Sequence, residues 1–529
     1  MRDMHYPGRS TVHAMNGMCA TSQPLAAEAA VTLLRQGGNA VDAAVCASAV
    51  LCVVEPYNTG IGGDCFALLS MGGSGEVIGL NGSGRAPRGA SAQKLRDQGI
   101  GEIGLTSVHS VTIPGAVDAW DRLLKDHGTM GFAEVLAPAI RFAEEGFPVS
   151  PRVSLEWRYL TDHLKKDPAA AAHFLTNGEG PEVGQVVRMP GLAATLRLIA
   201  ENGRAGFYEG AVAEDLVAKL QSLGGAHTLD DFVSTCADYV TPTRTDYRER
   251  QVLEIPPNGQ GITAQIALNV LKCFELGKLD PHGPERFHLE MEACRLAYDL
   301  RDKYIADPEF GPVPVDDLLS SKTAAALADR IDPNHALKDV AANRDPLNRD
   351  TIYLTVVDKD RNAISFINSL YQAFGSGITG PKSAVVMQNR GAGFVLTEGH
   401  PNCLDGGKRP LHTIIPGMLV EGGKATMPFG VMGGAFQPVG HVHLMTNFID
   451  FGMDVQEALD SPRAFPGAAS IEVEKGIDAA VRAGLEARGH TVSNALLPLG
   501  GGQAIYLDPV YGGLIGGSDP RKDGAAIGY

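Results

Sequence analysis

The sequence predicts a folded protein of mixed α/β (α+β) class, and three observations support this prediction. Of its 529 residues, 44% are hydrophobic and 20% are charged, a composition typical of globular chains. Residues 114–339 mostly show the apolar spacing of amphipathic helices. From residue 351 onward the pattern becomes the alternation of strands. No Pro-, Gly- or Ser-rich linker separates the two parts, so we expect them to share one fold.

The N-terminal region predicts two helices followed by a strand. A first-turn proline opens the helix of residues 25–36, and a glycine pair ends it. Asn39 is placed to cap a second helix, residues 40–54, which is small and apolar on nearly every face and is therefore expected to be buried. The glycine-rich loop 59–64 then leads into a strand over residues 65–69, so we expect helices packed behind a sheet.

The middle of the chain predicts a series of helices and one β segment. Helical apolar spacing occurs at residues 117–127, 132–145, 192–202, 211–223, 262–274 and 288–304. Residues 247–255 are β-like and lead into the Pro- and Gly-rich loop 256–261. Near the C-terminus, residues 439–450 predict a further helix.

Charge and composition exclude several classes of partner. The chain has 61 acidic and 45 basic residues, a net charge of -16, and no Lys/Arg cluster, which argues against nucleic acid and anionic membranes. The longest apolar run, residues 43–54, is too short to span a bilayer. The N-terminus lacks the apolar core of a secretory signal, so we predict a cytoplasmic protein. Eight cysteines without a C-x-x-C motif fit buried thiols in a reducing compartment.

Two motifs that suggest a cofactor fail in context. Gly375–Gly380 matches the G-x-G-x-x-G string of dinucleotide sites, but Pro381 and β-like sequence follow where a helix is required. His288, Glu290 and Glu292 are spaced by two residues, which places them on different faces of a helix and disfavours a metal site. We therefore predict neither a cofactor nor a metal.

The junction between Asp350 and Thr351 is the candidate reactive point. A polar, helix-poor stretch, residues 341–350, runs directly into the strand predicted for residues 351–358. If the Asp350–Thr351 bond is cut, Thr351 gains a free α-amine with a pKa of about 8 beside its own hydroxyl. A threonine with an N-terminal amine is a recognised activated nucleophile. The alternative is an edge strand entered from a loop.

Two further stretches offer groups suited to amide chemistry. Arg85 emerges from a glycine-rich loop and could bind a carboxylate through both guanidinium nitrogens; the alternative is a solvated surface arginine. Gly433 and Gly434 lie in a turn before a predicted helix, and successive glycines can direct two N–H groups toward one point, as an oxyanion hole requires. An ordinary strand-to-helix turn is the alternative there.

Taken together, several ordered stretches resemble the γ-glutamyltransferase family of N-terminal-nucleophile (Ntn) hydrolases over nearly the whole chain. The stretches are Gln36–Ala44, Val54–Pro56 with Gly60–Gly63, Glu145–Val149, Asp350–Asp360, Phe374–Gly377, Lys408–Leu411, Gly433–Gly434 and Ser518–Ala526. The resemblance implies a four-layer αββα sandwich with extra helices in the N-terminal part. It also implies an inactive precursor that cleaves itself between Asp350 and Thr351.

Cleavage would give a large subunit, residues 1–350, and a small subunit, residues 351–529. The resemblance implies that the two fragments stay together as an αβ heterodimer in one core, alone or as a dimer of heterodimers. Thr351 would be the nucleophile, with Ser369 as a second hydroxyl that orients it, and the N–H groups of Gly433 and Gly434 would hold the oxyanion. The substrate would be a small-molecule amide.

The chain departs from the family where a γ-glutamyl group would be recognised. Residues 389–394 lack the acidic pair that holds the substrate α-amine, and Tyr371 stands where the family has an asparagine. His412 and Thr413 replace two serines, and Ser83 replaces the carboxylate-binding arginine. An ammonium group left without an anionic partner in a closed site costs several kcal/mol, so a γ-glutamyl donor is disfavoured.

The remaining residues favour a small acyl group that carries a carboxylate but no amine. Arg85 and Arg390 would supply positive charge, and Tyr371, His412 and Thr413 would complete the substrate pocket. This pattern resembles the oxamate amidohydrolase-like branch of the family. Two alternatives stay open: a γ-glutamyl hydrolase or transferase that acts on glutathione or other γ-glutamyl amides, and an inactive binding or scaffold homologue.

Overall fold

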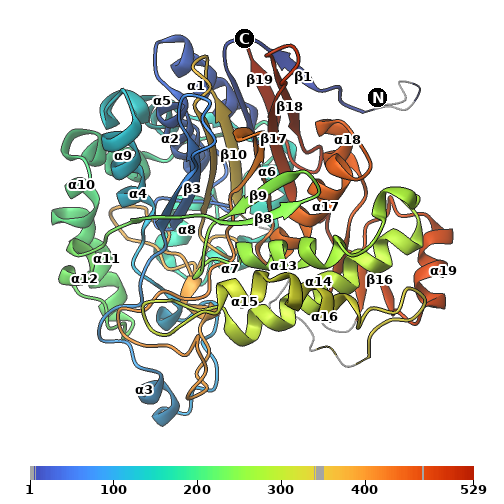
Figure 1. Ribbon diagram of the computed structural model, residues 1–529. Coiled ribbons are helices and arrows are strands. Elements are labelled where there is room, and N and C mark those ends of the chain that lie inside the picture. Colours follow the sequence, from blue (N-terminus) through green and yellow to red (C-terminus); the bar gives the residue numbers. More distant parts are fainter. Residues whose placement is uncertain (1–4, 6–7, 339, 341–350, 468–469) are drawn as a thin grey trace.

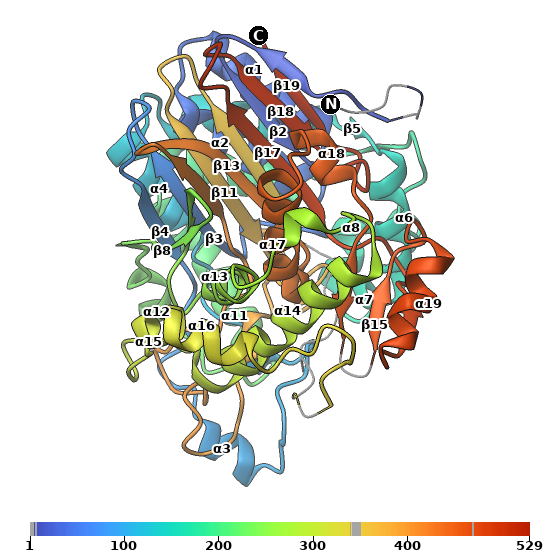
Figure 2. The ribbon, with the colours of Figure 1, turned by 45° about the vertical axis from the view of Figure 1, so that its right-hand side comes forward.

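Two seven-stranded sheets lie face to face between two layers of helices, as Figures 1 and 2 show for the computed structural model. The structure describes residues 5, 8–338, 340, 351–467 and 470–529. The predicted mixed α/β class and the αββα sandwich implied by the family resemblance are therefore confirmed.

The first sheet joins strands from both ends and the middle of the chain. Its order is β19 (Ala525–Gly528), β2 (Met18–Thr21), β10 (Ile352–Val357), β11 (Ala363–Ser369), β3 (Asp64–Ser70), β4 (Ile78–Gly82) and β7 (Asp238–Val240). Every pairing in it is antiparallel. The strands on both sides of the predicted cleavage point thus hydrogen-bond to one another, because β10 lies between β2 and β11.

The second sheet is antiparallel throughout. Its order is β1 (Val12–Ala14), β18 (Leu514–Ser518), β17 (Gly501–Leu507), β13 (Lys424–Met432), β12 (Gly417–Glu421), β9 (Arg250–Glu254) and β8 (Thr243–Tyr247). Like the first, it combines strands from both predicted subunits.

Helices cover the outer face of each sheet. Over the first sheet lie α1 (Pro24–Arg35), α2 (Ala40–Val54), α4 (Ala116–His127), α5 (Phe132–Glu145) and α9 (Pro190–Asn202), seen on the left of Figure 1. Over the second lie α13 (Gly261–Leu271), α14 (Pro284–Tyr304), α17 (Gln437–Ile449) and α18 (Val455–Asp460). Every residue of α2 is buried, as its all-round apolar sequence predicts, and Asn39 caps it in a capping box with Asp42.

Smaller elements surround the sandwich. The helices are α3 (Ala92–Asp97), α6 (Pro151–Tyr159), α7 (Thr161–Leu164), α8 (Pro168–Phe174), α10 (Ala205–Tyr208), α11 (Gly210–Ser222), α12 (Leu229–Val233), α15 (Val315–Leu319), α16 (Ser321–Ala328) and α19 (Ala479–Ala487). The strands are the pair β5 (Phe147–Pro148) and β6 (Val186–Val187) and the small sheet β14 (Ala464–Pro466), β15 (Ile471–Val473) and β16 (Val492–Asn494).

Strand alternation divides the core into three apolar layers. In β10, Ile352, Leu354 and Val356 join the cluster beneath the first helix layer. Tyr353 and Val357 point the other way, into the cluster between the two sheets. A third cluster lies between the second sheet and its helices. Successive side chains of a strand point to opposite faces, and β10 is buried on both because it is central.

The predicted helices are present, with ends shifted by up to four residues. The prediction of one β segment at residues 247–255 is wrong, because this region contains a turn between two strands. Residues 243–254 form the hairpin of β8 and β9, which turns at Arg248 and Glu249. Arg248 has a φ of 55°, a left-handed conformation uncommon outside glycine. Because the turn contains neither Gly nor Pro, its sequence gives no break signal.

The predicted buried thiols are confirmed for five cysteines, Cys19, Cys46, Cys52, Cys65 and Cys294. Cys236 and Cys273 are exposed, and all eight thiols are free. Within the described residues, no helix is both long and apolar enough to cross a membrane.

Candidate active site

Three polar side chains lie in a row across the first sheet at one end of the sandwich. Ser369, the last residue of β11, is paired in register with Asp64, the first residue of β3. On the other side, β10 pairs Ile352 with Asn368, which brings Thr351 opposite Ser369. All three positions share the alternation of Tyr353, so their side chains face the second sheet. The register therefore brings together residues more than 280 positions apart in sequence.

Thr351 is buried and paired with the second predicted hydroxyl. Its Oγ1 lies 2.9 Å from Ser369 Oγ, and Ser369 Oγ also accepts a hydrogen bond of 2.9 Å from the backbone N–H of Tyr371. The φ of Thr351 is 131°, which a β-branched residue rarely adopts. Strain of this kind costs about 1–3 kcal/mol. Asp350, the other half of the predicted cleavage point, lies outside the described residues.

The glycine turn lies at the end of β13, in the second sheet. Gly433 and Gly434 have φ angles of 127° and 55°, so the turn requires residues without a Cβ. Among the described residues, neither backbone N–H donates to an acceptor. Two N–H groups that remain available at a buried turn are what an oxyanion hole requires.

Gln260, which the sequence analysis did not single out, holds this turn in place. Its side-chain Nε2 donates to the carbonyl oxygens of Gly434 at 2.9 Å and Thr413 at 2.7 Å. Its Oε1 accepts from Arg301 at 2.8 Å, and its backbone N–H donates to the carbonyl of His412 at 2.9 Å. One buried side chain thus fixes the glycine turn relative to the predicted substrate residues 412 and 413.

Arg390 is a positive charge linked to the Thr351–Ser369 pair through Tyr371. It lies in the short 3-10 helix η3 (Arg390–Gly393) and is fully buried. Its guanidinium stacks over the ring of Tyr371 at 4.3 Å, and its Nη1 donates to Thr413 Oγ1 at 2.6 Å. Arg390 therefore contacts both of the other predicted substrate residues, Tyr371 and Thr413, and the Tyr371 backbone joins this group to Ser369.

His412 is buried and joins this group through Asp64. Its Nε2 lies 2.9 Å from Asp64 Oδ2, and Asp64 Oδ1 accepts from Gly115 N–H and Gln388 Nε2. Burial, together with the charge of Arg390, lowers the pKa of His412 to about 4, although Asp64 opposes that shift. At neutral pH the imidazole is therefore uncharged, and its Nε2–H donates a hydrogen bond to Asp64.

Arg85 does not join this group. Its two Nη atoms form a bidentate pair with Glu309, at 2.9 and 2.7 Å, and Nη1 also donates to the carbonyl of Gly407. The pair lies near Asp238 and Asp307, and the Arg85 side chain is about one-third exposed. Because its guanidinium is already bound by carboxylates, these contacts disfavour the substrate-binding role predicted for Arg85.

Sequence reasoning missed three buried residues that organise the site: Asp64, Asn258 and Gln260. Asn258 bridges Ser83 Oγ and the carbonyl of Pro410, while its own carbonyl accepts from His412 N–H. The Pro- and Gly-rich loop 256–261 was visible as a loop, but only its contacts show that it ties the two sheets together here. For Asp64, its place directly before the strand predicted at residues 65–69 was the available signal.

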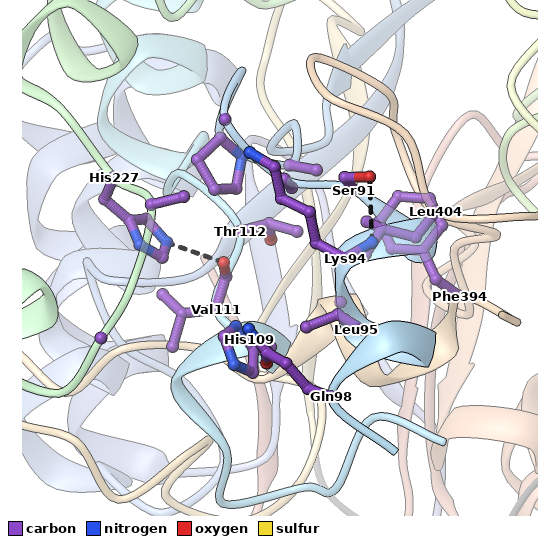
Figure 3. Close-up of a pocket in the computed structure, with 17 residues that line it drawn as sticks. Ser91, Lys94, Leu95, Gln98, His109, Val111, Thr112, His227, Phe394 and Leu404 are labelled. Atoms are coloured by element: carbon purple, nitrogen blue, oxygen red, sulfur yellow. Dashed lines mark hydrogen bonds between the residues drawn. The ribbon is translucent and has the colours of Figure 1, made fainter. Parts of the chain in front are cut away.

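A separate small cavity lies behind η3. Figure 3 shows its wall, which includes Lys94 from α3, His109 and His227, and its volume is about 160 Å³. Burial lowers the pKa of His227 to about 4, and its Nε2 lies 2.9 Å from the Val111 carbonyl. Of its wall, Gly391 directly follows Arg390 and Ala86 directly follows Arg85. Among the described residues, no group of three His, Cys, Asp or Glu side chains could hold a metal ion.

Comparisons with known proteins agree over almost the whole length. The γ-glutamyltranspeptidase family profile matches residues 26–529. The glutathione hydrolase-like YwrD proenzyme of Bacillus subtilis strain 168 is 37% identical over 97% of this chain and 98% of its own. The oxamate amidohydrolase proenzyme of Klebsiella pneumoniae is 33% identical over 99% and 100%. The cephalosporin acylase structure from Bacillus halodurans superposes with a TM-score of 0.94, at 40% identity, over 100% and 99%.

Proposed function

Because the chain belongs to the γ-glutamyltranspeptidase family and is an Ntn hydrolase, we propose that it is an autoprocessing amidohydrolase with Thr351 as nucleophile and a small, carboxylate-bearing acyl group as substrate. Oxamate-like amides are the substrate class. The observation that supports this best is the buried group Arg390, Tyr371 and Thr413 beside the Thr351–Ser369 pair.

Processing begins with the precursor. Thr351 Oγ attacks the carbonyl carbon of Asp350, the peptide C–N bond breaks as the acyl group moves to oxygen, and water hydrolyses the resulting ester. The products are the Asp350 carboxylate and a free α-amine on Thr351. The fragments 1–350 and 351–529 then stay associated, since both sheets contain strands from each.

The same hydroxyl then acts on the substrate. The Thr351 α-amine takes the Oγ proton as Oγ attacks the amide carbonyl, and the N–H groups of Gly433 and Gly434 stabilise the oxyanion. The proton passes to the leaving nitrogen as the C–N bond breaks. Water attacks the ester with the same amine as base, which releases the acid and restores Thr351.

Charge at the site favours an acyl group with a carboxylate and no ammonium. Arg390 is a buried guanidinium, whose planar fork matches a carboxylate. The one carboxylate in the row across the sheet, Asp64, already accepts hydrogen bonds from three donors. A substrate ammonium would therefore lie near the positive charge of Arg390, and Asp64 is already engaged by other donors. Placing the ammonium there would cost several kcal/mol.

Two assays on the purified protein test the proposal. Ammonia release from oxamate is compared with p-nitroaniline release from γ-glutamyl-p-nitroanilide, with Thr351→Ala as the inactive control. We expect turnover of oxamate to be the faster by kcat/KM. Efficient turnover of the γ-glutamyl compound alone would replace the proposal with a γ-glutamyl hydrolase.

A further inference from the structure

A wide, largely apolar cavity opens beside the loop that follows Ser369. Its volume is about 730 Å³. Its apolar wall includes Leu155, Tyr159 and Leu160 of the α6–α7 region on one side and Leu496 and Leu497 on the other. Figure 2 shows α6 and α7 near β15, whose Glu472 also lines the cavity. The wall thus comes from both sides of the predicted cleavage point.

The cavity adjoins the two chain segments that carry Tyr371 and Arg390. Two residues that line it are Gln372, which directly follows Tyr371, and Asn389, which directly precedes Arg390. The backbone N–H of Gln372 donates to Asn389 Oδ1 at 3.1 Å, which fixes the two segments against each other. A molecule held by Arg390 and attacked by Thr351 therefore has this cavity as a neighbouring space for its remaining part.

The exposed leucine and tyrosine side chains make the cavity unusual for a surface. Leu155 is 57% exposed, Tyr159 79% and Leu496 83%, so large apolar groups face solvent together. Single exposed apolar residues are ordinary, but a concave cluster of them marks a binding surface.

The wall offers an anionic occupant little compensation. Among its described lining residues there is no Lys or Arg. Glu156, which also lines it, is already paired with Arg152 and Lys522. Burial lowers the pKa of His163, so its imidazole is neutral at pH 7. The acyl side of the site has the opposite character, because Arg390 is positive.

We propose that this cavity binds the amine half of the substrate, and that this half is an apolar, aromatic-sized group without a carboxylate. The inference rests on the proposed function for the acyl half. It makes the preferred substrate an N-substituted amide of a small acid rather than a simple primary amide. Hydrolysis breaks the same C–N bond, and the apolar amine leaves with the proton.

Three oxalyl amides that differ only in the leaving amine test this: oxamate, N-benzyloxamate and N-oxalylglycine. Oxalate release is measured for all three, so the readout is independent of the amine. We expect kcat/KM for the benzyl amide to exceed that for oxamate about tenfold or more. N-oxalylglycine is expected to be the poorest, because it places a carboxylate against an apolar wall whose described residues include no Lys or Arg. A benzyl amide no better than oxamate would overturn the inference.

Variants of the cavity wall separate the cavity from the catalytic groups. Leu496→Asp changes a side chain that is 83% exposed, so the fold is expected to tolerate it. It should remove the benzyl preference and leave oxamate turnover unchanged. Val510→Asp, at a 75% exposed position in the β17–β18 turn outside the cavity wall, is the matched control and should keep the preference. Retention of the preference in Leu496→Asp would count against the cavity.

Failure of the proposed function is distinguishable from failure of this inference. If no oxalyl amide is cleaved, the same comparison is made with L-glutamine and γ-glutamylbenzylamide, read as glutamate release. A benzyl preference there that Leu496→Asp removes would support the cavity and reject the oxalyl group. If no amide of either acid is cleaved, saturable binding of benzylamine, lost in Leu496→Asp, would support the cavity, and its absence would reject it.

Discussion

At the scale of single residues, the Thr351 hydroxyl depends on the Ser369 hydroxyl opposite it, and the two differ in the role proposed for them. Only Thr351 would gain an α-amine on the proposed cleavage, so Ser369 could not replace it as nucleophile and base together. Ser369 Oγ lies between Thr351 Oγ1 and the Tyr371 N–H, both at 2.9 Å. It therefore holds the Thr351 hydroxyl in one orientation.

Thr351→Ala should neither process nor hydrolyse amides, because it removes the attacking oxygen. Denaturing electrophoresis should show one band near 55.8 kDa for this variant and two bands for the wild type. Thr351→Ser, which keeps the hydroxyl, is the matched control and should still split. A Thr351→Ala chain that splits between residues 350 and 351 would show that another group attacks the bond.

Arg390→Gln should impair the use of carboxylate-bearing acyl groups. Loss of a buried charge partner costs about 2 kcal/mol or more, so we expect kcat/KM for oxamate to fall at least about thirtyfold. Processing of the precursor should continue, since Thr351 is unchanged. Arg85→Gln is the control, because Arg85 is bound by Glu309, and it should have little effect. A larger loss of kcat/KM in Arg85→Gln than in Arg390→Gln would identify Arg85 as the arginine that binds the substrate.

These residues also show where sequence reasoning ends. The family resemblance paired Thr351 with Ser369, and their hydroxyl oxygens do lie 2.9 Å apart. Their catalytic roles stay predictions. The contrast between Arg85 and Arg390 could not be predicted. It depends on Glu309, which is 224 positions from Arg85 in sequence and takes up its guanidinium.

At the scale of elements, the turn between α2 and β3 packs against Ser369 and fixes the position of the end of β11. The backbone N–H groups of Gly115 and Ala116 both donate to the carbonyl of Gly63, which anchors this turn. A Cβ on Gly63 would lie 2.2 Å from the carbonyl oxygen of Ser369. Backbone must move to relieve such a contact, and the end of β11 would move with it.

Gly63→Ala should therefore slow processing and reduce stability by about 1–3 kcal/mol. The measurements are the time course of band splitting and the midpoint of urea unfolding. Gly104→Ala is the matched control, since no atom lies within 4 Å of its added Cβ. Normal processing in Gly63→Ala would show that the position of Ser369 tolerates a shift of the turn.

The elements themselves were largely predictable, and their connections were not. Local periodicity and caps indicate helices such as α1, α2 and α5, because those signals lie within each segment. The hairpin of β8 and β9 escaped detection because a positive φ at Arg248 replaces the usual glycine. The role of the loop 256–261 depends on contacts with residues 410–413 and 434, which only the folded chain brings near.

At the scale of the whole molecule, the sandwich is shared rather than divided. In the first sheet, β10 and β11 lie between β2 and β3, so strands of the predicted small subunit are flanked by strands of the large one. Separating the fragments would expose the apolar layer between the sheets and that beneath the helices. The mostly helical part and the strand-rich part of the sequence therefore do not correspond to two domains. The absence of a linker between them was the signal for this.

The pH dependence of stability is also a property of the whole molecule, because four histidines in different layers have a pKa lowered to about 4. They are His227, His412, His443 and His490, and burial is the largest cause for each. In the unfolded chain their pKa is about 6.5. Between pH 6.5 and 4 the unfolded state therefore binds more protons, and stability falls as pH is lowered through this range.

Two buried carboxyl groups act in the opposite direction. Burial raises the pKa of Glu55 to about 7 and raises the pKa of Glu254. The folded protein therefore loses stability through each group as pH rises above the pKa that the group has in the unfolded chain. The four histidines outnumber them. We expect the urea midpoint of the uncleaved Thr351→Ala chain to be lower at pH 5 than at pH 7, with a difference of several kcal/mol in unfolding free energy. His227→Gln in that background should reduce the difference, because one proton fewer is taken up on unfolding. A midpoint that stays constant from pH 7 to pH 5, or rises, would show that the histidines do not remain neutral in the folded state.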